Sequence, residues 1–423
     1  MSRVLPASEG RVLLEDSLRP VLIFLRCNGL VSDFLAPNRE HRALYIARCI
    51  FTALIMLIVS SLLIFELNQI VFIHLYEEKN VLFMTTTCMI AFNGSLAVLT
   101  AYTFFVHGKQ FQQFFEGWKQ VEIQSSHCWN SNNQNKKTKG LNIFKGFHFL
   151  VLIMLPGQLT YYYLNSPNVP YFLSYHPFFR ERLNTYFICF FHASSVYYCY
   201  LLGLLVDVLS TCFFYHAGCV IEDLVSEVQH TTELYFSKNV TFTESGNSID
   251  SASNCDGIDQ YREGRPFRRL WQRYETVLDW VNRGNQLFGL LILGSQLISF
   301  VTAIVSIFFA FKMLTLSPLF GLMAAVFSIL TGFRIVLINQ LVSHLYLSRG
   351  NLRCAIAALM SAEWYLLSGE DRHLLVSFQA RLDQEDLAAC PMHLFTINPT
   401  NLLTMLSLTV TYMVVIFQTD AVV

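Results

Sequence analysis

The chain has 423 residues, of which 53% are hydrophobic, 14% are aromatic and only 14% are charged, against about 25% charged in ordinary soluble domains. This composition, with a mean hydropathy of +0.42, excludes an ordinary water-soluble globular protein and indicates a chain that crosses a membrane several times. The formal net charge of -1 excludes a basic nucleic-acid-binding protein.

Seven segments are apolar over about 20 residues, which is the length that a helix needs to cross the hydrocarbon. In chain order they cover residues 43–65, 81–106, 146–163, 183–206, 286–311, 318–341 and 399–419. The sixth segment contains Arg334, for which we expect a snorkelling or ion-paired side chain near the inner boundary of the membrane. The sequence therefore predicts an all-α membrane protein with seven transmembrane helices.

Lys and Arg residues lie mainly on one side of these segments. The N-terminal tail and the second, fourth and sixth connections hold 23 of them, whereas the other three connections hold 4. Because Lys and Arg concentrate in cytoplasmic loops, we expect a cytoplasmic N-terminus and an extracellular C-terminus. This orientation is opposite to that of a G-protein-coupled receptor.

The long inner connections indicate helices that continue beyond the bilayer. Leu270, Tyr274 and Val277, for example, recur at helical spacing before the fifth segment. Residues 237–264 are rich in Ser, Asn, Asp and Gly, so we expect a disordered loop there. The expected divisions are a cytoplasmic N-terminal segment at 1–42 and a six-helix transmembrane bundle with cytosolic extensions at 43–345. Cytosolic anchor helices at 346–392 and a last helix at 393–423 follow.

The last 35 or so residues carry the most specific motif in the chain. They hold the run Leu-Phe-Thr-Ile-Asn at 394–398, and then Thr411, Tyr412, five apolar residues and Gln418. This pattern resembles the C-terminal signature of the arthropod gustatory receptor family, which also has seven spans with the orientation deduced above. Thr419 stands where that family usually has Phe.

The resemblance implies a ligand-gated, non-selective cation channel of four identical or related subunits, in which the bundle over 43–345 senses the ligand and the last helices surround the pore. Met413 stands where the sugar-receptor branch commonly has Glu, which favours a bitter or other small-molecule ligand. The implied location is the plasma membrane of a sensory neuron dendrite. The expected partners are a small-molecule tastant, permeant monovalent and divalent cations, membrane lipid and related receptor chains, with no cofactor and no nucleic acid.

A ligand that arrives from outside reaches the outer halves of the spans, where aromatic walls with a few polar groups suit a small organic molecule. The expected pocket residues are Phe83, Thr87, Asn93, Gln158, Tyr161, Tyr162, Tyr186, Phe190, His192, Phe308, Phe320 and Phe327. The alternative interpretation is an interfacial aromatic belt with lipid-facing Phe, as in any membrane protein.

The last helix carries a polar stripe that can be identified without the family. An advance of about 100° per residue places five polar side chains within about 60° of one another. They are Thr400, Thr404, Ser407, Thr411 and Gln418. Lipid offers no hydrogen-bonding partner, so the stripe either bonds to other helices of its subunit or lines a water-filled pore. In a pore, Val414, Val415 or Phe417 would supply the apolar constriction.

Enzyme chemistry finds little support in the sequence. The 12 His are scattered, and neither a H-E-x-x-H motif, a C-x-x-C motif nor a Walker-type glycine loop occurs, so we expect no catalytic residue and no metal site. Two other classes stay open beside the channel. One is a seven-helix receptor that signals only through partner proteins, and the other is a secondary transporter, although we find no internal repeat of the kind transporters use.

Overall fold

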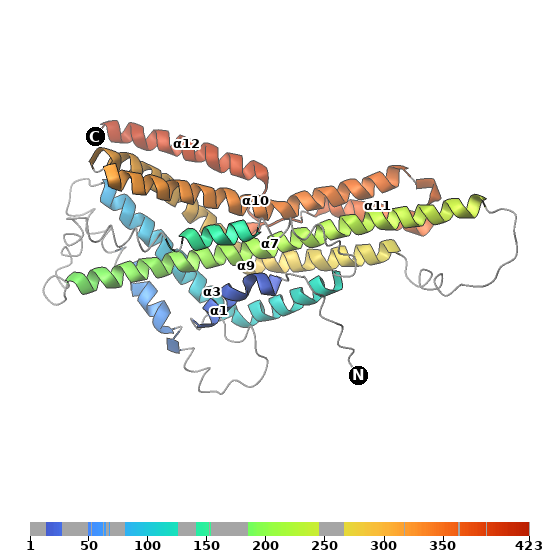
Figure 1. The fold of residues 1–423 in the computed structure, drawn as a ribbon, viewed down its shortest axis with the longest axis horizontal. Helices are drawn as coiled ribbons and strands as arrows, with labels where there is room; N and C mark the ends of the chain where they lie inside the picture. The colour runs from blue at the N-terminus through green and yellow to red at the C-terminus, as the bar shows by residue number, and fades with distance from the viewer. Residues whose placement is uncertain are drawn as a thin grey trace.

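The computed structural model describes residues 14–27, most of 50–67, 81–125, 141–151, 153, 185–244, 266–316, 318–362, 364–385 and 387–422. Long helices run roughly along the longest axis of the molecule, and no β-strand occurs in these residues (Figure 1). The elements are α1 (Leu14–Cys27), α3 (Val81–Ser125), α7 (Thr185–Glu244), α9 (Pro266–Leu316), α10 (Pro318–Ala362), η2 (Trp364–Leu366), α11 (Gly369–Gln384), η3 (Pro391–His393) and α12 (Pro399–Val422). The expected all-α fold is confirmed.

Four helices are much longer than a bilayer requires. α7 has 60 residues, α9 has 51, and α3 and α10 have 45 each, against about 20 needed to cross the hydrocarbon. The expected helical continuation past the fourth, fifth and sixth apolar segments is therefore present in α7, α9 and α10, and α3 continues past the second segment in the same way.

One boundary of the expected disordered loop is wrong. Residues 237–244 belong to that loop in the sequence-based division, but they form the last turns of α7. A helix that is already formed gains one backbone hydrogen bond for each residue added, so it continues through a polar sequence more easily than a new helix starts there. The rest of the loop, 245–264, lies outside the described residues.

The described helices with the length and hydropathy of membrane spans are parts of α3, α7, α9 and α10. Two shorter apolar helices, Leu141–Val151 and Pro399–Val415, coincide with parts of the third and seventh predicted segments. The first predicted segment is described only within 50–67. The count of seven spans, their orientation and the four-subunit assembly stay predictions.

Aromatic side chains join α3, α7 and α9 in the core. The ring of Phe114 lies 4.8 Å from that of Phe213 and 5.9 Å from that of Phe288, and the ring of Trp118 lies 5.0 Å from Phe213. All four side chains are buried, and the three pairs meet edge to face, which is the favoured geometry of aromatic pairs.

α11 packs on the part of α9 that precedes the apolar segment. Tyr274 and Trp271 of α9 hold the ring of Phe378 at centroid distances of 5.2 and 5.3 Å. Arg381 donates a hydrogen bond of 3.2 Å to Glu275, and this bond raises the pKa of the guanidinium. The two helices therefore form one packed unit.

α1 is a helix that the expected elements do not include. Leu14, Leu18 and Leu22 recur every four residues and are buried against the bundle. The backbone N–H of Leu14 donates to the carboxylate of Glu122 on α3 at 3.0 Å. An acidic group at a helix N-terminus satisfies a free N–H and interacts favourably with the helix dipole, so Glu122 fixes the start of α1.

Candidate functional site

α12 lies along the outside of the bundle and packs against α9 and α10 (Figure 1). The side chains that it turns toward them are partly buried: Met405, Thr409, Met413 and Phe417. The ring of Phe417 lies 5.2 Å from that of Phe311 on α9. On a helical wheel this covered face lies about 140–260° from Thr400, opposite the polar stripe.

The polar stripe is on the uncovered face of α12. Thr404, Ser407, Thr411 and Gln418 are exposed in the single chain. The hydroxyls of Thr404 and Thr411 donate to carbonyl oxygens of the preceding turn, at 3.2 and 3.0 Å. These two threonines therefore bond to their own helix, and the stripe faces away from α9 and α10.

The three apolar residues expected at a constriction do not share one face. Val414 and Val415 flank the stripe and are 48% and 47% exposed. Phe417 instead packs on α9, because it lies about 100° from Gln418 on the helix in the direction of the covered face. The structure thus leaves the two valines beside the stripe and removes Phe417 from it.

Three of the expected pocket residues have side chains that the structure describes. Asn93 of α3 and Phe308 of α9 are buried, and Phe327 of α10 packs its ring 6.3 Å from that of Tyr200 on α7. The ring of Phe308 also lies 6.0 Å from that of Phe417, which links the bundle interior to the covered face of α12.

The other expected pocket residues are described in part or not at all. Six of them lie on described helices, but their side chains are outside the described set: Phe83, Thr87, Tyr186, Phe190, His192 and Phe320. Gln158, Tyr161 and Tyr162 lie outside the described residues. The complete pocket therefore stays a prediction.

A buried ion pair connects three helices. Arg334 of α10 donates from Nε to the Asp207 carboxylate of α7 at 2.6 Å and pairs with it through Nη2, while Ser295 of α9 donates to the other carboxylate oxygen. The Asp207 side chain is 3% exposed and that of Arg334 is 11% exposed. The ion-paired role expected of Arg334 is confirmed. Its partner was missed, although Asp207 is a single acid directly after an apolar segment.

Small hydroxyl groups line the buried face of α9, another feature that the sequence reasoning missed. They recur at helical spacing and are all buried: Ser295, Ser299, Thr302 and Ser306. Nearby on the same helix, Gln296 accepts a hydrogen bond of 3.3 Å from Asn339 of α10. The bundle interior around α9 therefore offers hydrogen-bonding groups toward both α7 and α10 as well as apolar surface.

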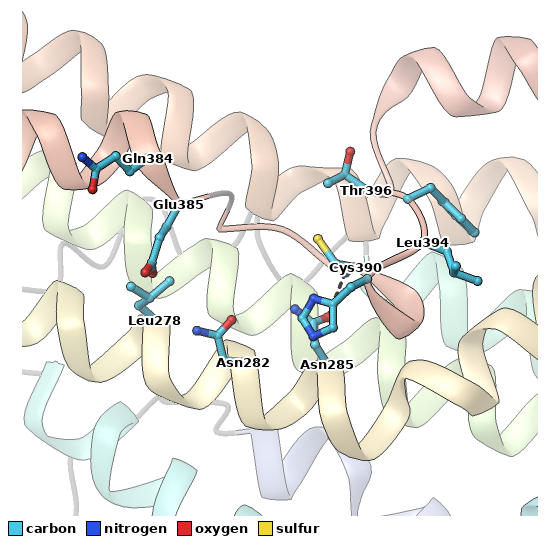
Figure 2. Close-up of a pocket in the computed structure, with 10 residues that line it drawn as sticks. Leu278, Asn282, Asn285, Gln384, Glu385, Cys390, Leu394 and Thr396 are labelled. Atoms are coloured by element: carbon cyan, nitrogen blue, oxygen red, sulfur yellow. Dashed lines mark hydrogen bonds between the residues drawn. The ribbon is translucent and has the colours of Figure 1, made fainter.

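A cleft of about 490 Å³ lies at the foot of α12, between α9 and the connection that joins α11 to α12 (Figure 2). Its walls are Leu278, Asn282, Asn285, Gln384, Glu385, Cys390, His393, Leu394, Phe395 and Thr396. None of the expected pocket residues is among them. Within the described part of the chain, no group of three or more His, Cys, Asp or Glu could hold a metal ion.

Comparison with known proteins places this arrangement in a family. The structure is similar to that of the insect olfactory receptor OR5 from Machilis hrabei, with a TM-score of 0.68 and 12% identity over 96% of this chain and 98% of that chain. The same receptor in complex with eugenol gives a TM-score of 0.67 at the same identity and coverage. At 12% identity these similarities show the fold alone. No curated protein sequence matches the chain.

The sequence itself carries the family assignment. The model of the family described as 7tm Chemosensory receptor matches residues 18–422, from within α1 to the end of α12. Because this match spans nearly the whole chain, the chain belongs to the 7tm chemosensory receptor family.

Proposed function

We propose that the chain is a gustatory-type receptor that forms a ligand-gated, non-selective cation channel, with α12 of each of four subunits around a central pore. The observation that carries this proposal is the exposed polar stripe of α12, opposite the face by which α12 packs on its own chain. Thr404 and Thr411 are satisfied by their own helix, but a Gln418 amide that faced lipid would lack a partner, whereas four stripes around one axis enclose water.

The residues of the uncovered face take separate roles in this pore. Thr404 and Thr411 donate to their own helix, which leaves hydroxyl lone pairs directed to water and cations. Val414 and Val415 form the apolar ring that closes the pore by dewetting. Gln418 lies near the outer mouth, because the N-terminus is cytoplasmic and the C-terminus extracellular, and its amide contacts passing cations.

The proposed ligand is a small organic molecule, such as a bitter tastant, that binds between the helices from the outer side. Support comes from the membership of the chemosensory family and from the buried hydroxyls of α9, which occur on the same helix as the buried ring of Phe308. The eugenol complex of the OR5 receptor favours an aromatic compound of similar size. Displacement of Phe308 by such a ligand acts on α12 through the contact with Phe417.

Whole-cell recording from cells that express this chain alone tests the proposal. A panel of small aromatic compounds, eugenol included, is applied to these cells. The active compounds are expected to evoke an inward cation current that persists when GDPβS in the pipette blocks G proteins. A current abolished by GDPβS would indicate a receptor that signals through partners. Substrate uptake without a channel conductance would indicate a transporter.

A further inference from the structure

The connection between α11 and α12 is a folded element rather than a loose tether. Leu387, Ala388, Ala389 and Ile397 are completely buried. The N–H of Ile397 donates to the carbonyl of Ala389 at 2.9 Å, which closes the connection into a loop. Movement of this loop must therefore involve the surface on which it packs.

That surface is α9, and Asn285 supplies the polar contacts. The Nδ2 of Asn285 donates to the carbonyl of Ala388 at 3.0 Å. Its Oδ1 accepts from the backbone N–H of Cys390 at 2.9 Å (Figure 2). The Asn285 residue is only 5% exposed. One buried amide therefore uses both of its polar ends on a single connection.

The next turn of α9 holds the same loop by close approach. A Cβ at Gly289 would lie 3.0 Å from the backbone nitrogen of Met392. Met392 and His393 have φ values of 53° and 57°, a left-handed conformation that costs free energy in residues other than Gly. Such a pair persists only where the surroundings impose it, and Asn285 and Gly289 provide those surroundings.

The far end of the loop is tied directly to α12. The Oδ1 of Asn398 accepts from the N–H of Asn401 at 2.9 Å and caps the helix, while the Asn401 side chain donates back to the carbonyl of Thr396. Pro399 occupies the first helical position. The loop and the first turn of α12 thus move together.

We propose that Asn285 is a positioning residue for gating, which couples α9 to the foot of α12 and so transmits ligand binding to the pore. The inference rests on the proposed function, because it requires that α12 lines the pore. The hydroxyl-lined face of α9 lies in the bundle interior, and the Asn285 amide joins the same helix to the loop that carries α12. A displacement of α9 on ligand binding therefore reaches the foot of α12 through this amide, in addition to the ring contact between Phe308 and Phe417.

Concentration–response curves of Asn285→Ala test the proposal, with Asn282→Ala as the matched control. Asn282 lies on the same helix and lines the same cleft, but its side chain is exposed. We expect Asn285→Ala to lower the maximal open probability and to raise the half-maximal ligand concentration by about tenfold, with unitary conductance and reversal potential unchanged. Asn282→Ala is expected to match the wild type.

Gly289→Ala provides an independent second variant. Ala has a higher helix propensity than Gly, so a defect cannot come from a weakened α9. The added Cβ instead presses on Met392. The same loss of open probability is expected. A reduced surface amount with normal concentration–response curves in both variants would show a purely structural role and overturn the proposal.

A measurement without current separates the two proposals. Hydrogen–deuterium exchange of the purified chain is expected to show faster exchange over 387–398 in Asn285→Ala than in Asn282→Ala. If exchange is faster in Asn285→Ala but even the wild type gives no ligand-evoked current, the proposed channel is rejected, and the proposed gating role of Asn285 is rejected with it. The contact between Asn285 and the loop over 387–398 would still be supported. Unchanged exchange beside a normal wild-type current would reject the Asn285 coupling alone.

Discussion

Arg334→Met is expected to lose most of its folded protein, because it leaves the Asp207 carboxylate buried and charged without its cation. Asp207 is 3% exposed and receives both Arg334 and Ser295. Removal of one partner of a buried ion pair costs roughly 3–5 kcal/mol, a large part of the stability of a typical domain. Thermal unfolding followed by fluorescence-detected size-exclusion chromatography measures the loss as a lower midpoint.

Two further variants separate the buried charge from the lost packing. The double variant Asp207→Asn with Arg334→Met is expected to recover much of the midpoint, because no charge stays buried and the new amide still accepts from Ser295. Arg353→Met breaks the pair between Arg353 and Asp383, in which the two side chains are 56% and 41% exposed. This variant is expected to lower the free energy of unfolding by less than about 1 kcal/mol. A double variant as unstable as Arg334→Met would contradict the explanation that the unpaired buried charge of Asp207 causes the loss of stability.

Cysteines placed along α12 are expected to react with a permeant cationic thiol reagent with helical periodicity. Cysteines at Thr404, Ser407, Thr411 and Gln418 face the proposed pore, so in the open state modification adds positive charge to the permeation path and reduces the current. Cysteines at Met405 and Thr409 face α9 and α10 and are expected to be silent. A difference in thiol reactivity between these two faces of α12 would identify the face that lines the pore.

The background for this experiment follows from the native thiols. Cys354 is exposed and Cys390 is partly buried, whereas Cys199, Cys212 and Cys219 are buried. We therefore expect reagent insensitivity only in a conducting background that replaces Cys354, Cys390 and the six cysteines whose side chains lie outside the described set. These six are Cys27, Cys49, Cys88, Cys128, Cys189 and Cys255. Reactivity without periodicity, or reactivity that follows Met405 and Thr409, would place the pore elsewhere.

Element type and several boundaries could be predicted from the sequence. The observed α3, α10 and α12 begin at Val81, Pro318 and Pro399, where the apolar segments were placed. At the two prolines the reason is local: Pro has no N–H to lose at the first helical position and its φ suits the helix. Apolar helices, and helix starts at a proline, can thus be predicted from short stretches of sequence.

The contacts between distant segments could not be predicted in this way. Asp207 and Arg334 are 127 residues apart, and each alone looks like a boundary or snorkelling residue. The periodicity of α12 identified a polar stripe, but only the packing of α12 on α9 shows which face is covered. Phe417 was therefore named as one of three candidates for the constriction, whereas its ring faces Phe311.

The foot of α12 shows the same limit at a finer scale. Asn285 is one of several polar residues in the run that joins the N-terminal part of α9 to its apolar part, and the sequence around it differs little from that around Asn282. Only the folded loop over 387–398 distinguishes them, because it buries one amide and leaves the other exposed.

Single-channel recording of the purified chain in planar lipid bilayers tests the central claim, that α12 lines a cation pore, most directly. With a small aromatic ligand the wild type is expected to show unitary cation currents without any added protein. Gln418→Lys is expected to lower the unitary conductance and Gln418→Glu to raise it, with a larger difference at low salt because added ions screen the charges. Unitary currents that are identical in the wild type and both variants, or that are absent from the purified chain, would contradict the account.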